Sequence, residues 1–358
     1  MSATATTISP ASTTSLSPSS TATCINVQPG KNGYLPPESC DAILYYVPSF
    51  AAAILFCALY CLTVIAHVVQ AYIYKKKYAW VLIMGGSWEL LAFVFRALLT
   101  RQQNSDGYNT AYVLLFLLAP IWINAFVYMT LGRLIYFFIP EKRLGGISAK
   151  RYGLLFVWLD IFSFIVQVGG ASISTGTDVP TKRVMLGLHI YMGGIGLQEL
   201  FVLIFTGFMI HLHRKIAHME REGTLGTEQL KKGPASWRWL FYAMYIALGM
   251  ITIRIIFRLA QFARGTDPNN PILTHEVYEY VLDAVPMFIA LLVLNIVHPG
   301  RILQGPDSEF LRVSRQEKKR IKEEKKVAKR AEREMKKQAR RKQDDVELVQ
   351  FPLTKRLT

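Results

Sequence analysis

Glu276-Val277-Tyr278-Glu279-Tyr280-Val281-Leu282-Asp283-Ala284-Val285-Pro286-Met287 begins the last long apolar segment of this chain, which continues to Gly300. The second half of the segment is apolar enough to lie in lipid, but the first half carries three carboxylates. Glu276, Glu279 and Asp283 are spaced i, i+3 and i+7, so on a helix they form one stripe. A charge at the centre of a bilayer costs at least ~2.5 kcal/mol and is tolerated when it faces protein, water or an opposite charge. Other helices must therefore supply basic partners.

Hydrophobic residues make up 51% of the 358 residues, and they gather in seven runs between residues 45 and 298. Each run is about 20 residues or longer, which is the length that crosses a hydrocarbon core of ~30 Å as a helix. The runs lack the polar outer face of a helix in a soluble protein. The sequence therefore predicts an all-α membrane protein with seven transmembrane helices, at residues 45–72, 78–100, 111–138, 152–174, 184–210, 237–262 and 276–298.

The connections between these helices differ in their content of basic residues. The odd-numbered connections hold twelve Lys and Arg, and the even-numbered connections hold four. Because connections rich in Lys and Arg stay in the cytoplasm, we expect the N-terminus outside and the C-terminus in the cytoplasm. The chain then divides into an extracellular tail (1–44), a transmembrane domain (45–300) and a cytoplasmic tail (301–358).

The N-terminal tail begins with a block in which 14 of 23 residues are Ser or Thr. This composition cannot bury a core and is typical of a disordered tail that carries O-linked sugars. Cys24 and Cys40 lie in this tail, and a disulfide between them fits an oxidising extracellular space. Two free thiols fit the sequence equally well. Cys57 and Cys61 fall in the first apolar run and are interpreted as small core residues.

The C-terminal tail is strongly basic. It contains 19 Lys and Arg against 10 Asp and Glu, which supplies +9 of the total charge of +16. Residues 308–342 lack Pro and Gly and favour a helix. A solvated charged helix is the simpler interpretation. The alternative is attraction to anionic lipids of the inner leaflet, at ~1 kcal/mol per basic residue near the surface. Neither interpretation involves nucleic acid.

Polar side chains interrupt five of the predicted helices, at Glu89, Arg96, Asp160, Gln167, Gln198, Glu199, Arg254, Arg258, Glu279 and Asp283. At 1.5 Å per residue, the three arginines share the outer half of the bundle with Glu276, Glu279 and Asp283. Glu89, Gln198 and Glu199 lie near mid-depth, Gln167 lies nearer the middle than Asp160, and Asp160 lies in the inner half. We expect Arg254 and Arg258 to pair with Glu279 and Asp283, with Arg96 and Glu89 nearby. These groups either fix helix packing or line a polar cavity for lipid headgroups. The second interpretation is favoured because intramembrane ionisable residues usually mark functional sites.

The sequence lacks the motifs that identify several other classes of protein. No Gly-x-x-x-x-Gly-Lys-Ser/Thr occurs, so no loop that binds ATP phosphates is expected. His211, His213 and His218 lack further ligands at metal-binding spacing, so neither a metal nor another cofactor is expected. No arrangement of nucleophile and base indicates an enzyme.

Seven short motifs occur in order, each at its own span: Tyr46-Val47-Pro48-Ser49; Glu89…Arg96; Leu118-Ala119-Pro120 with Tyr128…Leu131-Gly132-Arg133; Asp160…Gln167-Val168-Gly169-Gly170; Gly193…Gly196-Leu197-Gln198; Arg254-Ile255-Ile256-Phe257-Arg258; and Glu279-Tyr280…Asp283…His298-Pro299. Over residues 45–305 the chain resembles the fungal lipid-translocating exporter family. These seven-span proteins are associated with resistance to 7-aminocholesterol and to sphingoid long-chain bases.

The resemblance implies that the chain moves amphipathic lipids or sterol-like amines across or out of the plasma membrane of a fungus. One position departs from the family, which typically places Glu where this sequence has Gln261. Arg258 then lacks its i+3 acid, and the seventh helix would have to neutralise it. Two alternatives remain: a seven-span receptor or sensor that binds such a lipid, and an enzyme that modifies lipids.

Overall fold

The computed structural model describes residues 25–304 except 41, 45, 175–179, 227–235 and 264–269, and beyond them residue 310 and short pieces between 320 and 335. The chain separates into two compact units, residues 1–305 and residues 306–358. In the second unit, the described residues between 320 and 335 are helical. Two ion pairs there join residues one helical turn apart: Arg320 with Glu324 at 3.4 Å, and Lys326 with Glu323 at 3.2 Å.

Among the residues that the structure describes, seven helical segments are long and apolar enough to cross a membrane, which confirms the predicted number. They are α1 (Phe50–Tyr74), α2 (Ala79–Leu99), α3 (Asp106–Phe138), α4 (Ala149–Ser174), α5 (Thr181–Arg221), α6 (Trp237–Phe262) and the composite segment Glu276–Ile302. The composite segment contains α8 (Glu276–Glu279), a π-helical turn (Tyr280–Ala284), α9 (Val285–Ile296) and α10 (Pro299–Ile302). The shorter elements are a 3-10 turn (Lys31–Gly33), the hairpin β1 (Arg143–Leu144) and β2 (Ile147–Ser148), and α7 (Pro271–Thr274).

Three helix ends differ from the predicted ends by five residues or more, and one of them is the start of α3 at Asp106, five residues earlier than predicted. The first helix begins five residues later than predicted, because the Ser49 side chain caps it by accepting a hydrogen bond from the Ala52 amide. Helix α5 continues to Arg221, eleven residues past the predicted end. Leu212 and Ile216 in that extension are fully buried. At 41 residues α5 is about 60 Å long, so it extends well beyond a bilayer core.

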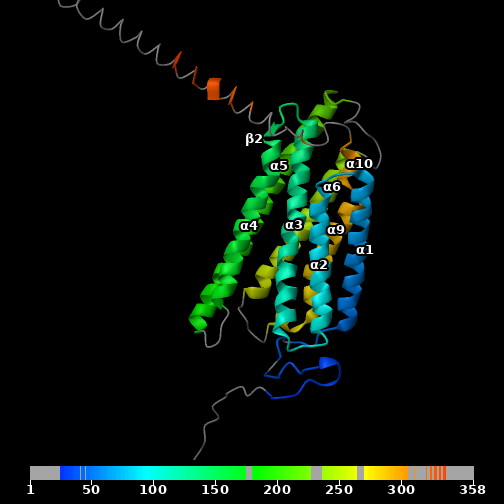
Figure 1. The fold of residues 1–358 in the computed structure, drawn as a ribbon, viewed down its shortest axis with the longest axis vertical. Coiled ribbons are helices and arrows are strands. Elements are labelled where there is room, and N and C mark those ends of the chain that lie inside the picture. Colours follow the sequence, from blue (N-terminus) through cyan, green and yellow to red (C-terminus); the bar gives the residue numbers. More distant parts are fainter. Residues whose placement is uncertain are drawn as a thin grey trace, which may run out of the picture. The chain divides into compact units, whose positions relative to one another are not determined.

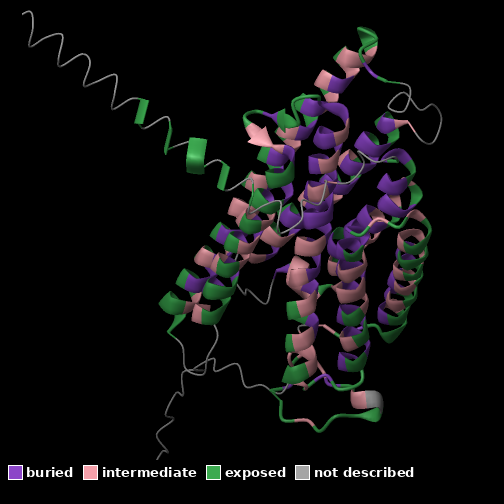
Figure 2. Cartoon of the chain, turned by 45° about the horizontal axis from the view of Figure 1, so that its top comes forward, coloured by how far each residue is buried: buried purple, intermediate pink, exposed green. Residues whose placement is uncertain are grey.

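The helices form a closed bundle in which neighbours in the sequence are neighbours in space. Each of α1 to α5 packs against the next helix, and α9 packs against both α6 and α1 (Figure 1). Buried residues concentrate on the inner faces of the helices (Figure 2). Large apolar side chains such as Leu62, Trp158 and Ile165 remain more than 60% exposed on the outside. A surface of this kind is rare on soluble monomers and suits contact with lipid.

Glycines bring α4 and α5 together. A Cβ atom added at Gly170 would lie 2.4 Å from the Tyr191 amide nitrogen, and one at Gly187 would lie 2.6 Å from the Gly170 carbonyl oxygen. Gly194 is similarly close to α4, whereas a Cβ at Gly193 or Gly196 would meet nothing within 4 Å. Only some of the glycines of α5 therefore serve close helix packing.

The segment that precedes α1 contacts the connection between α2 and α3. The Leu35 amide donates a 3.1 Å hydrogen bond to Gln103 Oε1, and Leu35 is only 2% exposed. Cys40 is disulfide-bonded, whereas Cys57 and Cys61 are free. Cys24 and the Ser/Thr-rich block lie outside the described residues, so the Cys24–Cys40 pairing stays a prediction.

A π-helical turn separates Glu279 from Pro286 in the last transmembrane segment. The Val285 amide donates to the Tyr280 carbonyl, five residues back. Pro286 cannot donate a hydrogen bond, and in a regular α-helix its ring would clash with the carbonyl four residues earlier. The wider turn before it relieves this conflict. It also presents the Ala284 carbonyl to the Tyr60 hydroxyl, which donates to it at 2.8 Å.

Candidate functional site

The deepest charges of the bundle meet at Asp283, in the π-helical turn. Arg254 Nε lies 2.6 Å from Asp283 Oδ1, and Arg258 Nε lies 2.5 Å from Asp283 Oδ2. The remaining donors of Arg254 reach Glu89 Oε1 at 3.3 Å and the Phe116 carbonyl at 2.7 Å. Glu89 and Asp283 are completely buried. Charges this deep are stable only while each keeps its partners.

A second charge cluster lies near the start of the last segment. Arg96 Nη2 is 2.9 Å from Glu276 Oε1 and 3.4 Å from Glu279 Oε2. The Tyr46 hydroxyl accepts a hydrogen bond from Arg96 and donates one to Glu279, and the Tyr112 hydroxyl donates to the other oxygen of Glu279. Burial, together with the charge of Glu279, raises the pKa of Tyr46 well above its usual value. Tyr46 therefore remains a neutral donor.

The predicted pairing is right for Asp283 and wrong for Glu279. Asp283 pairs with both arginines of α6, but Glu279 pairs with Arg96 of α2. Glu279 lies a full turn before Asp283, beside the segment that carries Tyr46, and Arg96 reaches that level from the far end of α2. Of the three acids in the stripe, Glu276 and Glu279 thus belong to the cluster around Arg96, and Asp283 belongs to the cluster with Arg254 and Arg258.

Gln261 keeps a contact with Arg258 although it lacks a carboxylate. Its side-chain oxygen accepts a 3.2 Å hydrogen bond from Arg258 Nη1. The charge of Arg258 is neutralised by Asp283, as expected from the sequence. Asp283 of the last transmembrane segment therefore neutralises Arg258 in place of the glutamate that the resemblance leads one to expect at position 261 of α6.

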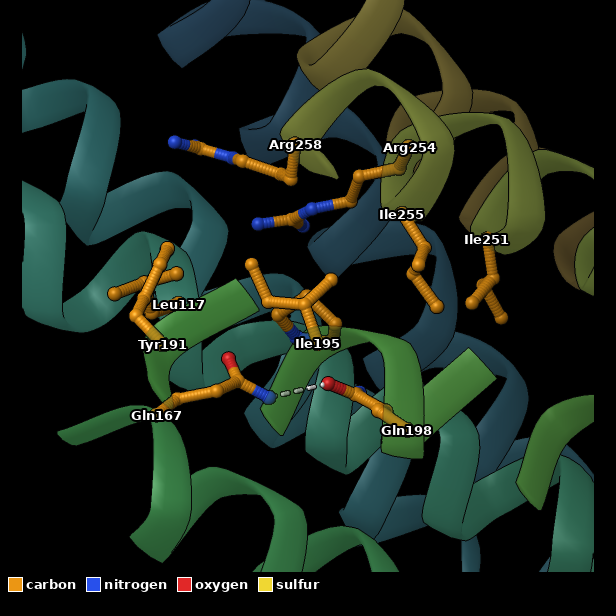
Figure 3. Close-up of a pocket in the computed structure, with 10 residues that line it drawn as sticks. Leu117, Gln167, Tyr191, Ile195, Gln198, Ile251, Arg254, Ile255 and Arg258 are labelled. Carbon is orange, nitrogen blue, oxygen red and sulfur yellow. Dashed lines mark hydrogen bonds between the residues drawn. The ribbon is translucent and has the colours of Figure 1, made fainter. Parts of the chain in front are cut away.

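A cleft opens beside Arg254 and Arg258 between α3, α4, α5 and α6. It encloses about 410 Å³ of empty space, open solvent included. Its lining consists of Leu117, Pro120, Gln167, Tyr191, Ile195, Gln198, Ile251, Arg254, Ile255 and Arg258. The two arginines lie on one side of the cleft and the two glutamines on the other (Figure 3).

The walls of the cleft suit an amphipathic ligand. Gln167 Nε2 donates a 3.0 Å hydrogen bond to Gln198 Oε1, which leaves amide groups of both residues for further bonds. Between the polar groups lie aliphatic side chains such as Leu117, Ile195 and Ile255. Pockets of this kind, mostly apolar with a few fixed polar groups, are typical ligand sites.

The ten candidate residues occupy three places. Gln167, Gln198, Arg254 and Arg258 line the cleft. The two charge clusters contain four more of the ten, namely Glu89, Arg96, Glu279 and Asp283, and in them the acids pair with the arginines. Asp160 and Glu199 contact neither group. Asp160 bonds with Asn124 and Tyr128, and Glu199 accepts a hydrogen bond from Thr252. The expected contact of these two residues with lipid therefore stays a prediction.

The sequence analysis missed several tyrosines that complete the site, above all Tyr112 in the second charge cluster and Tyr191 in the cleft. Tyrosine is common near membrane interfaces, so its presence there carries no signal of its own. Tyr46 was quoted only as part of a motif. Tyr46 lies shortly before the start of the first helix, and the sequence also contains intramembrane charges that need partners. These two facts together could have predicted that Tyr46 contacts the charged groups.

Tyr112→Phe tests whether the second charge cluster depends on its tyrosines. The change removes the hydroxyl that donates to Glu279 at 2.7 Å, and a hydrogen bond to a charged group contributes about 1.5–3 kcal/mol. We expect a lower midpoint in thermal unfolding of the detergent-solubilised protein. Tyr108→Phe is the matched control, one turn earlier on α3, and should unfold like the wild type. Equal midpoints for the two variants would contradict the role given to Tyr112.

Comparison with known proteins places the chain among fungal sequences. Residues 82–306 match the family described as RTA1 like protein. The probable lipid transporter atnI of Emericella nidulans is 59% identical over 308 residues, which cover 86% of this chain and 80% of that protein. The sphingoid long-chain base transporter RSB1 of Saccharomyces cerevisiae is 26% identical over 293 residues, 72% of this chain and 74% of that protein. Protein RTA1 of the same yeast is 26% identical over 280 residues, 71% and 84% of the two chains. No solved structure matches this chain.

Proposed function

This chain belongs to the RTA1-like protein family, and from that premise we propose that it moves amphipathic lipids across a membrane and exports them. The observation that carries the proposal is the cleft between α3 and α6, where two arginines and two glutamines face a largely aliphatic interior. Such a lining offers contacts both to a polar headgroup and to the first carbons of a chain. The names of the two transporters among the relatives support transport over sensing.

The substrate class that we propose is a sphingoid long-chain base or a sterol-like amine. The charge clusters beside the cleft contain four carboxyl groups and three guanidinium groups: Glu89, Glu276, Glu279 and Asp283 against Arg96, Arg254 and Arg258. Glu89 and Asp283 pair with Arg254, and Asp283 also pairs with Arg258, so a cationic headgroup in the cleft meets arginines whose charges are already paired. The hydroxyl groups of a long-chain base would find hydrogen-bond partners in Gln167 and Gln198. Export of such lipids gives resistance to them.

The proposed setting is the plasma membrane, with the N-terminus outside and the C-terminus in the cytoplasm. The count of basic residues in the connections supports this orientation. It places the cleft and both charge clusters toward the outer leaflet. The basic tail would then lie beside the anionic lipids of the inner leaflet. We propose no chemical conversion of the lipid.

Ile195→Trp tests whether lipid passes through the cleft. Ile195 lines the cleft and is 4% exposed, so a larger side chain there fills the cleft without changing any charge. Efflux of a fluorescent long-chain base from yeast cells that lack their own exporters should fall to the background level. Leu203→Trp is the matched control on the same helix, since Leu203 is 55% exposed on the outer face.

The two variants must be compared at equal surface expression, because overpacking alone costs about 1–3 kcal/mol. Leu203→Trp should retain wild-type efflux. Wild-type efflux by a well-expressed Ile195→Trp protein would show that the cleft is not the lipid path. Absence of any efflux by the wild type, with a changed transcriptional response to added lipid, would favour the sensor instead.

A further inference from the structure

Three buried polar side chains contact one another inside the bundle, separate from the two charge clusters. Asp160 of α4 accepts hydrogen bonds on Oδ2 from Asn124 Nδ2 at 2.9 Å and from the Tyr128 hydroxyl at 3.1 Å. All three residues are 0% exposed. Oδ1 of Asp160 and Oδ1 of Asn124 are buried without any hydrogen-bond partner among the described residues. Two oxygens of neighbouring side chains thus both lack a donor.

No cation faces this carboxyl group in the described part of the chain. From α3 the neighbouring titratable group is Tyr128, and Arg133 further along α3 lies over the Tyr78 ring at 3.7 Å. From α5 the nearest titratable side chain is Glu199, which accepts from Thr252 at 3.0 Å. The hairpin strand β2, which also packs on α4, contributes Ile147 and Ser148. An ionised Asp160 would be an uncompensated charge in a medium of low dielectric constant, which proteins avoid.

We propose that Asp160 is a proton-binding site. A proton on Asp160 Oδ1 removes the uncompensated charge, and the new O–H supplies the donor that Asn124 Oδ1 lacks. Acid and amide then form a reciprocal pair, in which the amide donates to Oδ2 and the acid donates to the amide oxygen. Asn124 and Tyr128 position the carboxyl group, and Asp160 alone gains and loses the proton.

The proton exchanges through the cleft. Ser163 and Gln167 follow Asp160 at i+3 and i+7 on the same face of α4, and Gln167 lines the cleft. On the other side the site is closed by aromatic rings, since Phe156 and Phe205 pack on Tyr128 with centroid distances of 5.4 and 4.5 Å. We therefore infer that the proton reaches Asp160 from the cleft along these polar side chains, because the opposite direction is lined by aromatic side chains.

This site gives the transporter an energy source, an inference that rests on the proposed function. The sequence has no phosphate-binding loop for ATP. If the cleft opens to the two sides of the membrane in turn, lipid and proton can use it one after the other, and the proton that leaves Asp160 on one side is replaced on the other. With one proton exchanged for each lipid, a difference of one pH unit drives an accumulation of about tenfold.

The first experiment reads the proton directly. Infrared difference spectra of the purified full-length protein in lipid, recorded between neutral and alkaline pH, should contain the carbonyl stretch of a buried protonated carboxyl group. Asp160→Asn should remove the band, and Tyr128→Phe should shift it, because one donor to Oδ2 is lost. Asp106→Asn, at an exposed carboxyl in the first turn of α3, should leave it unchanged.

The second experiment reads the coupling in proteoliposomes loaded with a fluorescent long-chain base under an imposed pH difference. Protein-free liposomes give the redistribution of the amine by itself, which is subtracted. The wild type and Asp106→Asn should show about tenfold accumulation per pH unit. Asp160→Asn is isosteric with the protonated acid and should equilibrate the lipid without responding to the pH difference.

The outcomes separate this inference from the proposed function. A wild-type protein that moves no lipid would remove the proposed function, and the infrared band alone would then decide the proton site. A wild-type spectrum without the band would overturn the proton site, as would a band that survives in Asp160→Asn. Transport by Asp160→Asn with the full response to pH, or a wild type that responds to a sodium gradient instead, would overturn the coupling.

Discussion

Asp283→Asn is expected to remove most of the folded protein. Asp283 is the shared partner of Arg254 and Arg258, at 2.6 and 2.5 Å, and it is completely buried. Its neutral replacement leaves two guanidinium groups with one carboxylate, Glu89, between them. Breaking a buried ion pair by removing one partner costs roughly 3–5 kcal/mol, a large part of the stability of an ordinary domain. We expect a strongly reduced monodisperse fraction in size-exclusion chromatography and a much lower unfolding midpoint.

Glu276→Gln provides the control for this prediction. Glu276 also pairs with an arginine, at 2.9 Å, but its side chain remains 12% exposed and Arg96 keeps Glu279 as a second partner. An ion pair that reaches solvent contributes about 1 kcal/mol or less, so this variant should remain folded. A folded, active Asp283→Asn protein would mean that Asp283 does not hold the arginines of the cleft.

Gly170→Val is expected to abolish efflux. A Cβ atom at position 170 would lie 2.4 Å from the Tyr191 amide nitrogen and 2.6 Å from the Gly187 carbonyl oxygen, so backbone must move. Helices α4 and α5 would separate, and Tyr191, which lines the cleft, would shift with α5. Overpacking of this kind costs about 1–3 kcal/mol and occasionally more. Lipid efflux and the unfolding midpoint should both fall.

Gly169→Val is the matched control because Gly169 is the preceding residue of the same helix. A Cβ atom there would meet nothing within 4 Å, and valine has a higher helix propensity than glycine. We expect wild-type efflux and an unfolding midpoint at least equal to that of the wild type. Similar behaviour of the two variants would show that close contact between α4 and α5 is not required.

The number of spans and the charge pairing of Asp283 could be predicted from the sequence. Both follow from strong energetic constraints: the length of an apolar run in a bilayer, and the cost of a buried charge without a partner. Depth along a helix is also readable, and it correctly brought Arg254 and Arg258 to the level of Asp283.

The rotation of each helix about its axis could not be predicted. Gln198 and Glu199 are neighbours in the sequence of α5, but Gln198 faces the cleft, and Glu199 accepts a hydrogen bond from Thr252 of α6. Rotation depends on which side chains fit between neighbouring helices, as for Gly170 against Tyr191, and a hydropathy pattern without a polar face does not report it. The partner of Glu279 was missed for the same reason.

Because of the π-helical turn at Tyr280–Ala284, inserting or deleting a single residue in this part of the chain would change which side chains face inward. Such a turn is an α-helical turn with one residue added. Losing that residue would turn everything after it by about 100° against everything before it. The acids at the beginning of the segment would then no longer face inward together with the residues that follow Pro286. An alignment gap of one position in this region would therefore signal a rebuilt site, even between relatives whose motifs on both sides are identical.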